Sequence, residues 1–139
     1  MRVHLTAAIL RLPNGSLVFN RRAEDDSQAG GLIGLFNGGI EQDETPEQAL
    51  RRELGEETSL AAGELVLRHL ASFEFPAQEA EGHEGGTSDI FLVDIPDDTF
   101  EPREGGKITL SYDEAMARPD LAPSLRALLP ILKERIYGT

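Results

Sequence analysis

The sequence predicts a single layered α/β domain. Short apolar runs rich in β-branched and aromatic residues, separated by turn-forming residues, are typical of strands. A capped helix in the middle of the chain and apolar residues at helical spacing near its end predict two helical regions. Strands interleaved with helices favour packed α/β layers around one core.

The length and composition set limits on this domain. The chain has 139 residues without internal repeats or a low-complexity tract, so residues 1–139 are expected to form one domain. A domain of this size buries roughly two-thirds of its unfolded surface. The sequence has no cysteine, no apolar run long enough to span a bilayer and no signal-peptide pattern. We therefore expect a cytoplasmic protein without disulfides, thiolate zinc sites or a membrane partner.

The charge narrows the class of ligand. The formal net charge is −12, from 13 basic and 25 acidic residues. Proteins that bind DNA or RNA as polymers depend on basic patches, so this class of partner is not expected. Small anionic ligands remain compatible, because a bound cation and a few arginines suffice to hold a phosphate.

The N-terminal part of the chain predicts a hairpin. Residues 3–12 are an apolar, β-forming run, and residues 13–16, Pro-Asn-Gly-Ser, are a turn signal. Residues 17–19 then begin a returning strand. After a polar loop at residues 23–31, the short apolar run of residues 32–36 predicts a further strand.

The central helix is predicted from its start signals. Thr45 is a favourable N-cap, Pro46 fits the first helical position, where its missing N–H costs nothing, and Gln48 completes a capping box. The end of a helix normally takes a left-handed residue, for which glycine is favoured. Ser59 would be strained there by roughly 1 kcal/mol, unless the helix ends differently. The apolar stripe of this helix consists of Ala49, Leu50 and Leu54.

The second half of the chain predicts three more strands and a terminal helix. Residues 64–75 and 88–95 are expected to be strands, and residues 107–111 a short strand. The terminal apolar stripe has helical spacing and is expected to pack on the core, with a kink or two abutting helices at Pro130. This stripe consists of Leu121, Leu125, Leu128, Leu129, Leu132 and Ile136. The expected loops of this half are residues 77–87 and 97–106.

Three glutamates give the central helix a second, acidic stripe. Glu53, Glu56 and Glu57 project within roughly a 100° arc, because residues three and four apart share a helix face. Carboxylates held side by side repel one another and raise each other's pKa. Mg²⁺ prefers carboxylate and water oxygens and is a common partner of polyphosphates. The stripe therefore indicates metal-assisted attack on a phosphate chain, with an ordinary solvated acidic helix as the alternative.

The residues around this stripe resemble the Nudix box. Gly38 is followed after five residues by Glu44, and after seven more by residues 52–60, Arg-Glu-Leu-Gly-Glu-Glu-Thr-Ser-Leu. Among the fixed positions only Ser59 departs, standing where the family has glycine. A solvated acidic helix does not explain the other fixed positions. The resemblance implies an α/β/α sandwich with a mixed sheet, in which residues 38–60 form a loop–helix–loop.

The resemblance and the local chemistry together imply roles for these residues. Glu53, Glu56 and Glu57 are expected to be metal ligands and catalytic residues. One of them is expected to activate the attacking water; the sequence does not decide which, and Glu53 is the first candidate. Arg52 and Glu44 are expected to lock the loop to the helix, since an arginine–carboxylate fork suits that structural duty.

Two glycines are expected to shape the loop. Gly38 and Gly39 allow close backbone approach and positive φ, as a loop around a metal or phosphate requires. Gly38 is therefore a candidate for substrate contact, and the carbonyl of Gly39 is a candidate metal ligand. A plain tight turn is the alternative.

Two segments outside the box resemble the MutT-like branch of the family, the 8-oxo-dGTP diphosphatases. Residues 20–23, Asn-Arg-Arg-Ala, are similar to paired arginines after the second strand, so Arg22 is a candidate for substrate contact. Residues 101–105, Glu-Pro-Arg-Glu-Gly, are similar to a downstream segment in which a glutamate supplies a distal metal ligand, and Glu104 occupies that position. The alternatives are an exposed strand end for Arg22 and a solvated loop glutamate for Glu104.

The resemblance implies an Mg²⁺-dependent pyrophosphohydrolase, with Mn²⁺ able to substitute. Its expected substrate is a nucleoside diphosphate linked to another moiety, first of all a nucleoside triphosphate cleaved to monophosphate and pyrophosphate. Leu121 stands near the place of a purine-reading asparagine in the MutT-like branch, so a strong preference for oxidised guanine is not expected. We expect a monomer or homodimer that binds small-molecule nucleotides.

Two alternatives remain open. The first is an ADP-ribose or NDP-sugar pyrophosphatase, for which Pro76 is a cue, because ADP-ribose-cleaving relatives carry a proline at about this place. The second is a non-catalytic nucleotide-binding module of the same fold. The intact Glu53, Glu56 and Glu57 argue against it, since a sensor need not retain them.

Overall fold

The structure is a computed structural model that describes residues 3–22, 31–75 and 85–138. Within these residues, one sheet of seven strands is flanked by helices. The strands are β1 (Val3–Arg11), β2 (Leu17–Arg21), β3 (Ile33–Gly34), β4 (Phe36–Gly39), β5 (Leu67–Phe75), β6 (Gly86–Asp94) and β7 (Gly106–Leu110). The helices are α1 (Pro46–Glu57), α2 (Tyr112–Ala117) and α3 (Pro123–Tyr137), with a short 3₁₀ turn, η1 (Ala62–Glu64).

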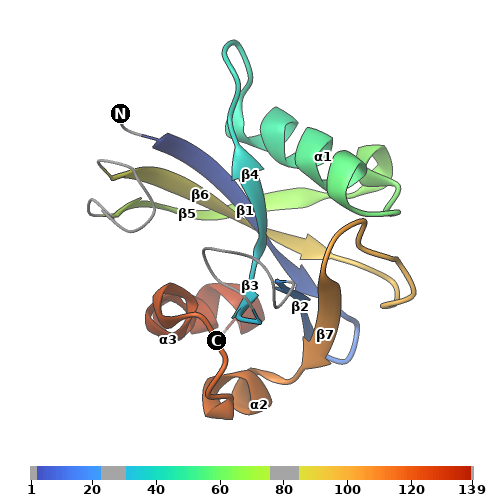
Figure 1. Cartoon of the computed structure of the whole chain (residues 1–139), viewed down its shortest axis with the longest axis vertical. Coiled ribbons are helices and arrows are strands. Elements are labelled where there is room, and N and C mark those ends of the chain that lie inside the picture. The colour runs from blue at the N-terminus through green and yellow to red at the C-terminus, as the bar shows by residue number, and fades with distance from the viewer. Residues whose placement is uncertain (1–2, 23–30, 76–84, 139) are drawn as a thin grey trace.

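The sheet is mixed, as the family resemblance implied. Its strand order is β3-β2-β1-β6-β5, with β4 beside β1 and β7 beside β2 (Figure 1). β1 and β6 run parallel from Val3 beside Gly86, whereas the other pairs are antiparallel. The predicted hairpin is present, because Leu10 of β1 pairs with Val18 of β2 around a turn in which Gly15 has a φ of 89°.

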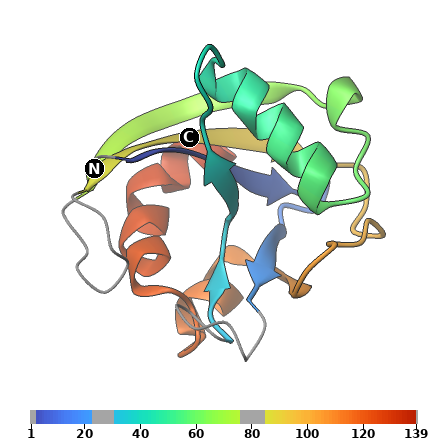
Figure 2. The ribbon, with the colours of Figure 1, turned by 45° about the horizontal axis from the view of Figure 1, so that its top comes forward.

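Two hydrophobic cores lie on the two faces of this sheet. Alternate residues of β1 point to opposite faces, as a strand requires. Ala7 and Ile9 join the core that includes the apolar side of α3, whereas Ala8 and Leu10 join the core that includes Leu50 of α1. Figures 1 and 2 show α1 on one side of the sheet and α3 on the other. This arrangement confirms the predicted α/β sandwich.

The predicted start of α1 is confirmed, and the helix does not end on a left-handed Ser59. The Thr45 hydroxyl accepts a hydrogen bond from the Gln48 N–H at 3.2 Å, and the Gln48 side-chain oxygen accepts from the Thr45 N–H at 2.9 Å. The helix ends at Glu57, and Thr58 is extended, with φ −137° and ψ 168°. Ser59 does not adopt a positive φ, so the strain considered for a left-handed residue is absent.

The glycine segment before α1 is a strand rather than a positive-φ loop. The expected strand at residues 32–36 divides into β3 and β4, and β4 continues through Gly38 and Gly39. These two glycines pair with Thr6 and Leu5 of β1, which holds them extended. Neither has a positive φ, contrary to the sequence-based expectation.

The C-terminal region contains one helix that was not predicted. Short helix α2 begins at a second capping box, in which the side chains of Ser111 and Glu114 each accept a hydrogen bond from the other's backbone N–H. Helix α3 runs without interruption through Pro130, so the expectation of two abutting helices is wrong. Pro130 is exposed, and solvent there can satisfy the carbonyl that loses its helical partner. The predicted core packing of the terminal stripe is confirmed by the burial of Leu125, Leu129, Leu132 and Ile136.

The remaining expectations concern the loops and the membrane. The predicted loops at residues 23–31 and 77–87 lie mostly outside the described residues, with Gly31 and residues 85–87 as the exceptions. β6 begins at Gly86, two residues before the predicted strand. None of the helices in the described part of the chain has the length and apolar character needed to cross a membrane.

Candidate active site

Arg52 connects the loop that precedes α1 to the helix itself. Its Nε and Nη2 donate to the two carboxylate oxygens of Glu44 at 2.8 and 3.0 Å. Nη2 also donates to the carbonyl oxygen of Gly39 at 2.9 Å. The hydrogen bonds from Arg52 hold the pKa of Glu44 below its usual value. The structure thus contains the Arg52–Glu44 pair that the sequence implied. The Gly39 carbonyl, which the sequence suggested as a metal ligand, instead accepts a hydrogen bond from Arg52.

Arg52 also contacts two of the three glutamates of the acidic stripe. Its Nη1 donates to Glu53 Oε1 at 2.9 Å and to Glu56 Oε2 at 3.3 Å. The guanidinium therefore offsets part of the repulsion between these carboxylates. From the sequence, Arg52 was expected to contact Glu44 alone, although the four-residue spacing between Arg52 and Glu56 signals a contact on the helix surface.

Glu53 lies directly against the backbone of β4. Its side chain is 15% exposed. A β-carbon added to Gly38 would come within 2.1 Å of the carboxyl carbon of Glu53, so a larger residue cannot be accommodated without displacing that carboxylate. The expected close approach at Gly38 is therefore present, and Glu53 makes it. A β-carbon on Gly39 would meet nothing within 4 Å.

Among the glutamates that the structure describes, Glu57 has the pKa displaced furthest from its usual value. Burial raises the pKa of Glu57 to about 7, and the neighbouring carboxylates of Glu53 and Glu56 shift the pKa in the same direction. Arg22 has a smaller, opposing effect on it. A cation bound beside Glu57 would favour its charged form and lower this pKa.

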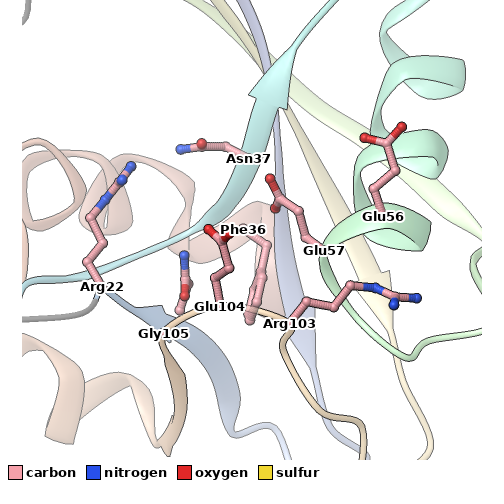
Figure 3. Close-up of a pocket in the computed structure, with 9 residues that line it drawn as sticks. Arg22, Phe36, Asn37, Glu56, Glu57, Arg103, Glu104 and Gly105 are labelled. Atoms are coloured by element: carbon pink, nitrogen blue, oxygen red, sulfur yellow. The ribbon is translucent and has the colours of Figure 1, made fainter. Parts of the chain in front are cut away.

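A hollow of about 400 Å³ brings together residues from four separate segments. In Figure 3 the Glu57 and Glu104 carboxylates point into this hollow, Arg22 lies across from them beyond Asn37, and Glu56 points away. The segments are the end of β2, the strand β4, the last turn of α1 and the residues before β7. The lining residues are Asn20, Arg22, Phe36, Asn37, Glu56, Glu57, Arg103, Glu104 and Gly105.

The hollow contains four of the residues that the sequence identified, Arg22, Glu56, Glu57 and Glu104. The other predicted site residues do not line it. Glu53 lies against Gly38, and Gly39, Glu44 and Arg52 form the hydrogen-bond network described above. The five other lining residues were not predicted from the sequence as site residues. Each of these five residues lies within two sequence positions of a predicted site residue, and this closeness in sequence could have identified them.

Leu121, which the family resemblance placed near a purine-reading position, does not line this hollow. It is 2% exposed in the core beside α3, where it forms a parallel bridge with Ile33. The carboxylate of the preceding Asp120 accepts hydrogen bonds from Arg21 and Arg118, both at 2.9 Å. The hydrogen bond from Arg118 is the main reason that the pKa of Asp120 is lowered to about 2.

The donor set of the hollow fits a hard divalent cation. Glu57 and Glu104 point carboxylate oxygens into the hollow, the ligands that Mg²⁺ prefers, and the Glu56 carboxylate lies nearby but points away. No three Asp, Glu, His or Cys side chains are already gathered to hold a metal ion, as far as the described residues extend. The hydrogen bonds from Arg52 to Glu53 and Glu56 provide a reason, because a cation would have to compete with the guanidinium for these carboxylates.

Comparison with known proteins places this geometry in context. The model of the NUDIX domain matches residues 2–131. The 8-oxo-dGTP diphosphatase of Escherichia coli (strain K12) is 38% identical over 76 residues, which cover 54% of this chain and 57% of the relative. The chain thus spans little more than half the length of this curated relative.

Solved structures share the fold along nearly the whole chain. The MutT protein from Methanosarcina mazei Go1 superposes with a TM-score of 0.79 at 17% identity, covering 96% of this chain and 94% of that one. A bifunctional NMN adenylyltransferase/ADP ribose pyrophosphatase from Francisella tularensis, solved with AMP and a Mn ion, superposes with a TM-score of 0.77 at 20% identity. That match covers 98% of this chain and 42% of the other. Both likenesses concern the fold.

Proposed function

The chain belongs to the NUDIX family, as the match over residues 2–131 shows, and on this premise we propose that it is a MutT-like pyrophosphohydrolase that requires a divalent metal. Its proposed substrate is a nucleoside diphosphate linked to another moiety, with nucleoside triphosphates first. Mg²⁺ is the proposed metal, and Mn²⁺ is expected to substitute for it. The similarity to an 8-oxo-dGTP diphosphatase supports the nucleotide class.

The observation that carries this proposal is the composition of the hollow. Carboxylates from the last turn of α1 and from the segment before β7 face the same space as Arg22. This arrangement offers oxygen ligands for a cation next to a guanidinium that suits a phosphate. A polyphosphate with its bound metal has a cation for the carboxylates and a negative phosphate for the guanidinium. It therefore matches the hollow better than a neutral ligand does.

Each group has a distinct task in this proposal. Glu57 and Glu104, whose carboxylates point into the hollow, hold the metal, and Glu56 joins them when its exposed side chain turns toward the cation. Arg22 binds a phosphate of the substrate. When bound, the divalent cation offsets charge on the phosphate chain and lowers the pKa of the attacking water. The water oxygen forms a bond to phosphorus while the phosphoanhydride bond breaks, and the proton of the water passes to a carboxylate.

The geometry favours Glu57 over Glu53 as the carboxylate that takes this proton. Glu57 lines the hollow, whereas Glu53 lies under Gly38 and accepts a hydrogen bond from Arg52. A general base must lie within hydrogen-bond reach of the water that it activates. Glu53 then acts on Glu57, one helical turn further along the same face of α1, as the neighbouring carboxylate that helps to raise its pKa.

The two alternative functions gain no specific support. Pro76, the cue for an ADP-ribose or NDP-sugar pyrophosphatase, lies outside the described residues. A non-catalytic binding module would not need carboxylates on two separate segments of one hollow. Hydrolysis of nucleoside triphosphates is therefore the proposal to test first.

The test is a product assay across substrate classes. The purified chain is incubated with Mg²⁺ and, in parallel, with dGTP, ATP, ADP-ribose and a UDP-sugar, and the released monophosphate and pyrophosphate are quantified. The proposal predicts pyrophosphate from triphosphates and no turnover in EDTA. Turnover of ADP-ribose or the UDP-sugar without turnover of the triphosphates would favour an ADP-ribose or NDP-sugar pyrophosphatase. Binding without turnover of any compound would favour a non-catalytic binding module.

A further inference from the structure

The end of α1 is joined to the segment that carries Glu104. Thr58 ends the helix in an extended conformation, with both its N–H and its hydroxyl bonded to the Leu54 carbonyl oxygen. Thr58 then pairs with Pro102 in an isolated antiparallel bridge. The end of α1 and residues 101–103 therefore run side by side, and Glu104, which lines the hollow, follows directly in the chain.

Ser59 and Glu101 exchange two hydrogen bonds at this junction. The Ser59 N–H donates to the Glu101 carbonyl oxygen at 2.9 Å, and the Glu101 N–H donates to Ser59 Oγ at 2.8 Å. The family motif has glycine in place of Ser59, and glycine lacks the oxygen that accepts the second bond. On the other side of the bridge, the Arg103 N–H donates to the Glu57 carbonyl oxygen at 2.7 Å. Three hydrogen bonds thus flank the Thr58–Pro102 pair.

These contacts determine where two lining residues of the hollow lie. Glu104 follows directly after Arg103, the last residue held to α1, and Glu57 supplies the carbonyl that holds it. The other flank of the segment is held by Lys107, whose ammonium donates to the carbonyls of Asp98 and Phe100. The segment is therefore attached on both sides, and Ser59 provides the only side-chain oxygen that bonds to residues 101–103 in the described part of the chain.

We propose that Ser59 is a positioning residue of the active site. Its Oγ holds residues 101–103 against the end of α1 and so sets Glu104 opposite Glu57. This inference rests on the proposed function for the roles of Glu57 and Glu104, while Ser59 itself lines no part of the hollow. The serine gives this chain a contact that a glycine at the same place cannot make.

Three substitutions and one control separate this role from general stability. Ser59→Ala and Ser59→Gly remove the accepting oxygen, whereas Ser59→Thr keeps a hydroxyl, and Ser59 is exposed enough to accept the extra methyl group. Ser124→Ala removes a hydroxyl from another exposed serine, on α3, and serves as the matched control.

The first measurement is amide hydrogen exchange of Glu101 by NMR, which requires no activity. Ser59→Ala and Ser59→Gly should speed this exchange about tenfold, because the Glu101 N–H loses its partner. Ser59→Thr and Ser124→Ala should exchange like the wild type. Unchanged exchange in Ser59→Ala would overturn the proposal at its first step.

The second measurement is Mn²⁺ affinity by calorimetry, followed by kcat and KM for a nucleoside triphosphate. Residues that orient metal ligands typically cost about tenfold or more in metal affinity when removed. Ser59→Ala should therefore lower Mn²⁺ affinity and kcat about tenfold with little change in KM, and Ser59→Thr should restore both. A purely structural role would instead lower the melting temperature and leave the ratio of kcat to KM unchanged in the folded fraction.

The outcomes are distinguishable from those of the proposed function. Wild-type Mn²⁺ affinity and kcat in Ser59→Ala would overturn the inference, as would a loss that Ser59→Thr fails to restore. If the wild-type chain cleaved no nucleotide, the proposed hydrolysis would be overturned, and the exchange and Mn²⁺ measurements would still decide the role of Ser59. If Ser59→Ala failed to fold, Ser59→Gly, which carries the residue of the family motif, would provide the same comparison.

Discussion

The carboxyl group of Glu53 occupies the space that a side chain on Gly38 would fill. The two residues meet where β4 passes α1, and a β-carbon at position 38 would lie within 2.1 Å of the Glu53 carboxyl carbon. The atoms in the way belong to the end of a flexible side chain, so Glu53 can move aside without disturbing the backbone. The conflict should therefore affect function more than stability.

Gly38→Ala is the substitution that tests this relationship. We expect it to displace Glu53, and with it Glu57, and to lower kcat/KM about a hundredfold, since small misplacements near a reacting centre have effects of that size. The melting temperature should change little. Gly34→Ala is the matched control, because a β-carbon there meets nothing within 4 Å, and steady-state rates with thermal melts on both variants provide the measurement.

Glu57→Gln separates catalysis from folding. The change removes the charge that the proposed metal site needs and keeps the shape of the side chain, so turnover should fall about a hundredfold or more. Stability in EDTA should be equal or higher, because the buried acid and its repulsion by Glu53 and Glu56 are gone. Glu47→Gln, on the exposed first turn of α1, is the control for losing one carboxylate, and full turnover by Glu57→Gln would contradict the assigned role.

Arg52→Ala should weaken the fold and the site together. It removes the two-point contact with Glu44, the hydrogen bond to the Gly39 carbonyl and the hydrogen bonds to Glu53 and Glu56. We expect a melting temperature several degrees lower and a smaller loss once Mg²⁺ is added, because the cation replaces part of the missing charge. Arg68→Ala, an exposed arginine on β5, should melt near the wild type, and equal shifts in both variants would refute the loop-locking role.

The raised pKa of Glu57 makes the stability of the metal-free protein depend on pH. Burial keeps this carboxyl protonated in the folded state up to about pH 7, whereas in the unfolded chain it ionises near its ordinary value of 4.5. Its contribution to stability is therefore fully present below pH 4.5 and is lost as pH rises to about 7. Melting temperatures in EDTA should show this decline between pH 5 and 7.

Metal binding should remove that decline. A bound cation favours the ionised carboxylate, so Mg²⁺ should stabilise the protein more at pH 7.5 than at pH 5.5, and its binding at pH 6 should release protons. Calorimetry in buffers of different ionisation enthalpy measures this release. Glu57→Gln should show neither the decline in EDTA nor the proton release, and a decline that persists in this variant would assign the titration to another group.

The substrate preference should be broad. The hollow offers the side-chain amides of Asn20 and Asn37, which donate and accept hydrogen bonds and so adapt to several base edges. We expect the kcat/KM values for 8-oxo-dGTP and dGTP to lie within about a hundredfold, a difference of roughly 2.7 kcal/mol. A larger ratio would show that a base-reading group exists, and Asn20→Ala and Asn37→Ala would then reveal whether either amide supplies it.

Features with local causes were predictable from the sequence. The capping box of Thr45 and Gln48 involves groups within one helical turn, and the hairpin between β1 and β2 follows from a turn signal between two apolar runs. The Glu44–Arg52 contact was predicted because the spacing of a family motif encodes it. In each of these three features, the interacting residues lie close together in the sequence.

The tertiary structure decided what depends on pairing between distant segments. β1 holds Gly38 and Gly39 extended, although their composition suggested a positive-φ loop. The register beside Ile33 places Leu121 in the core, away from the hollow.

The hollow itself is a tertiary product. It exists because residues 101–103 bind the end of α1 and bring Glu104 to Glu57. The sequence by itself determined which residues can bind metal and phosphate, since that depends on their chemistry. Their positions relative to one another depend on long-range hydrogen bonds and packing, which no local pattern in the chain encodes.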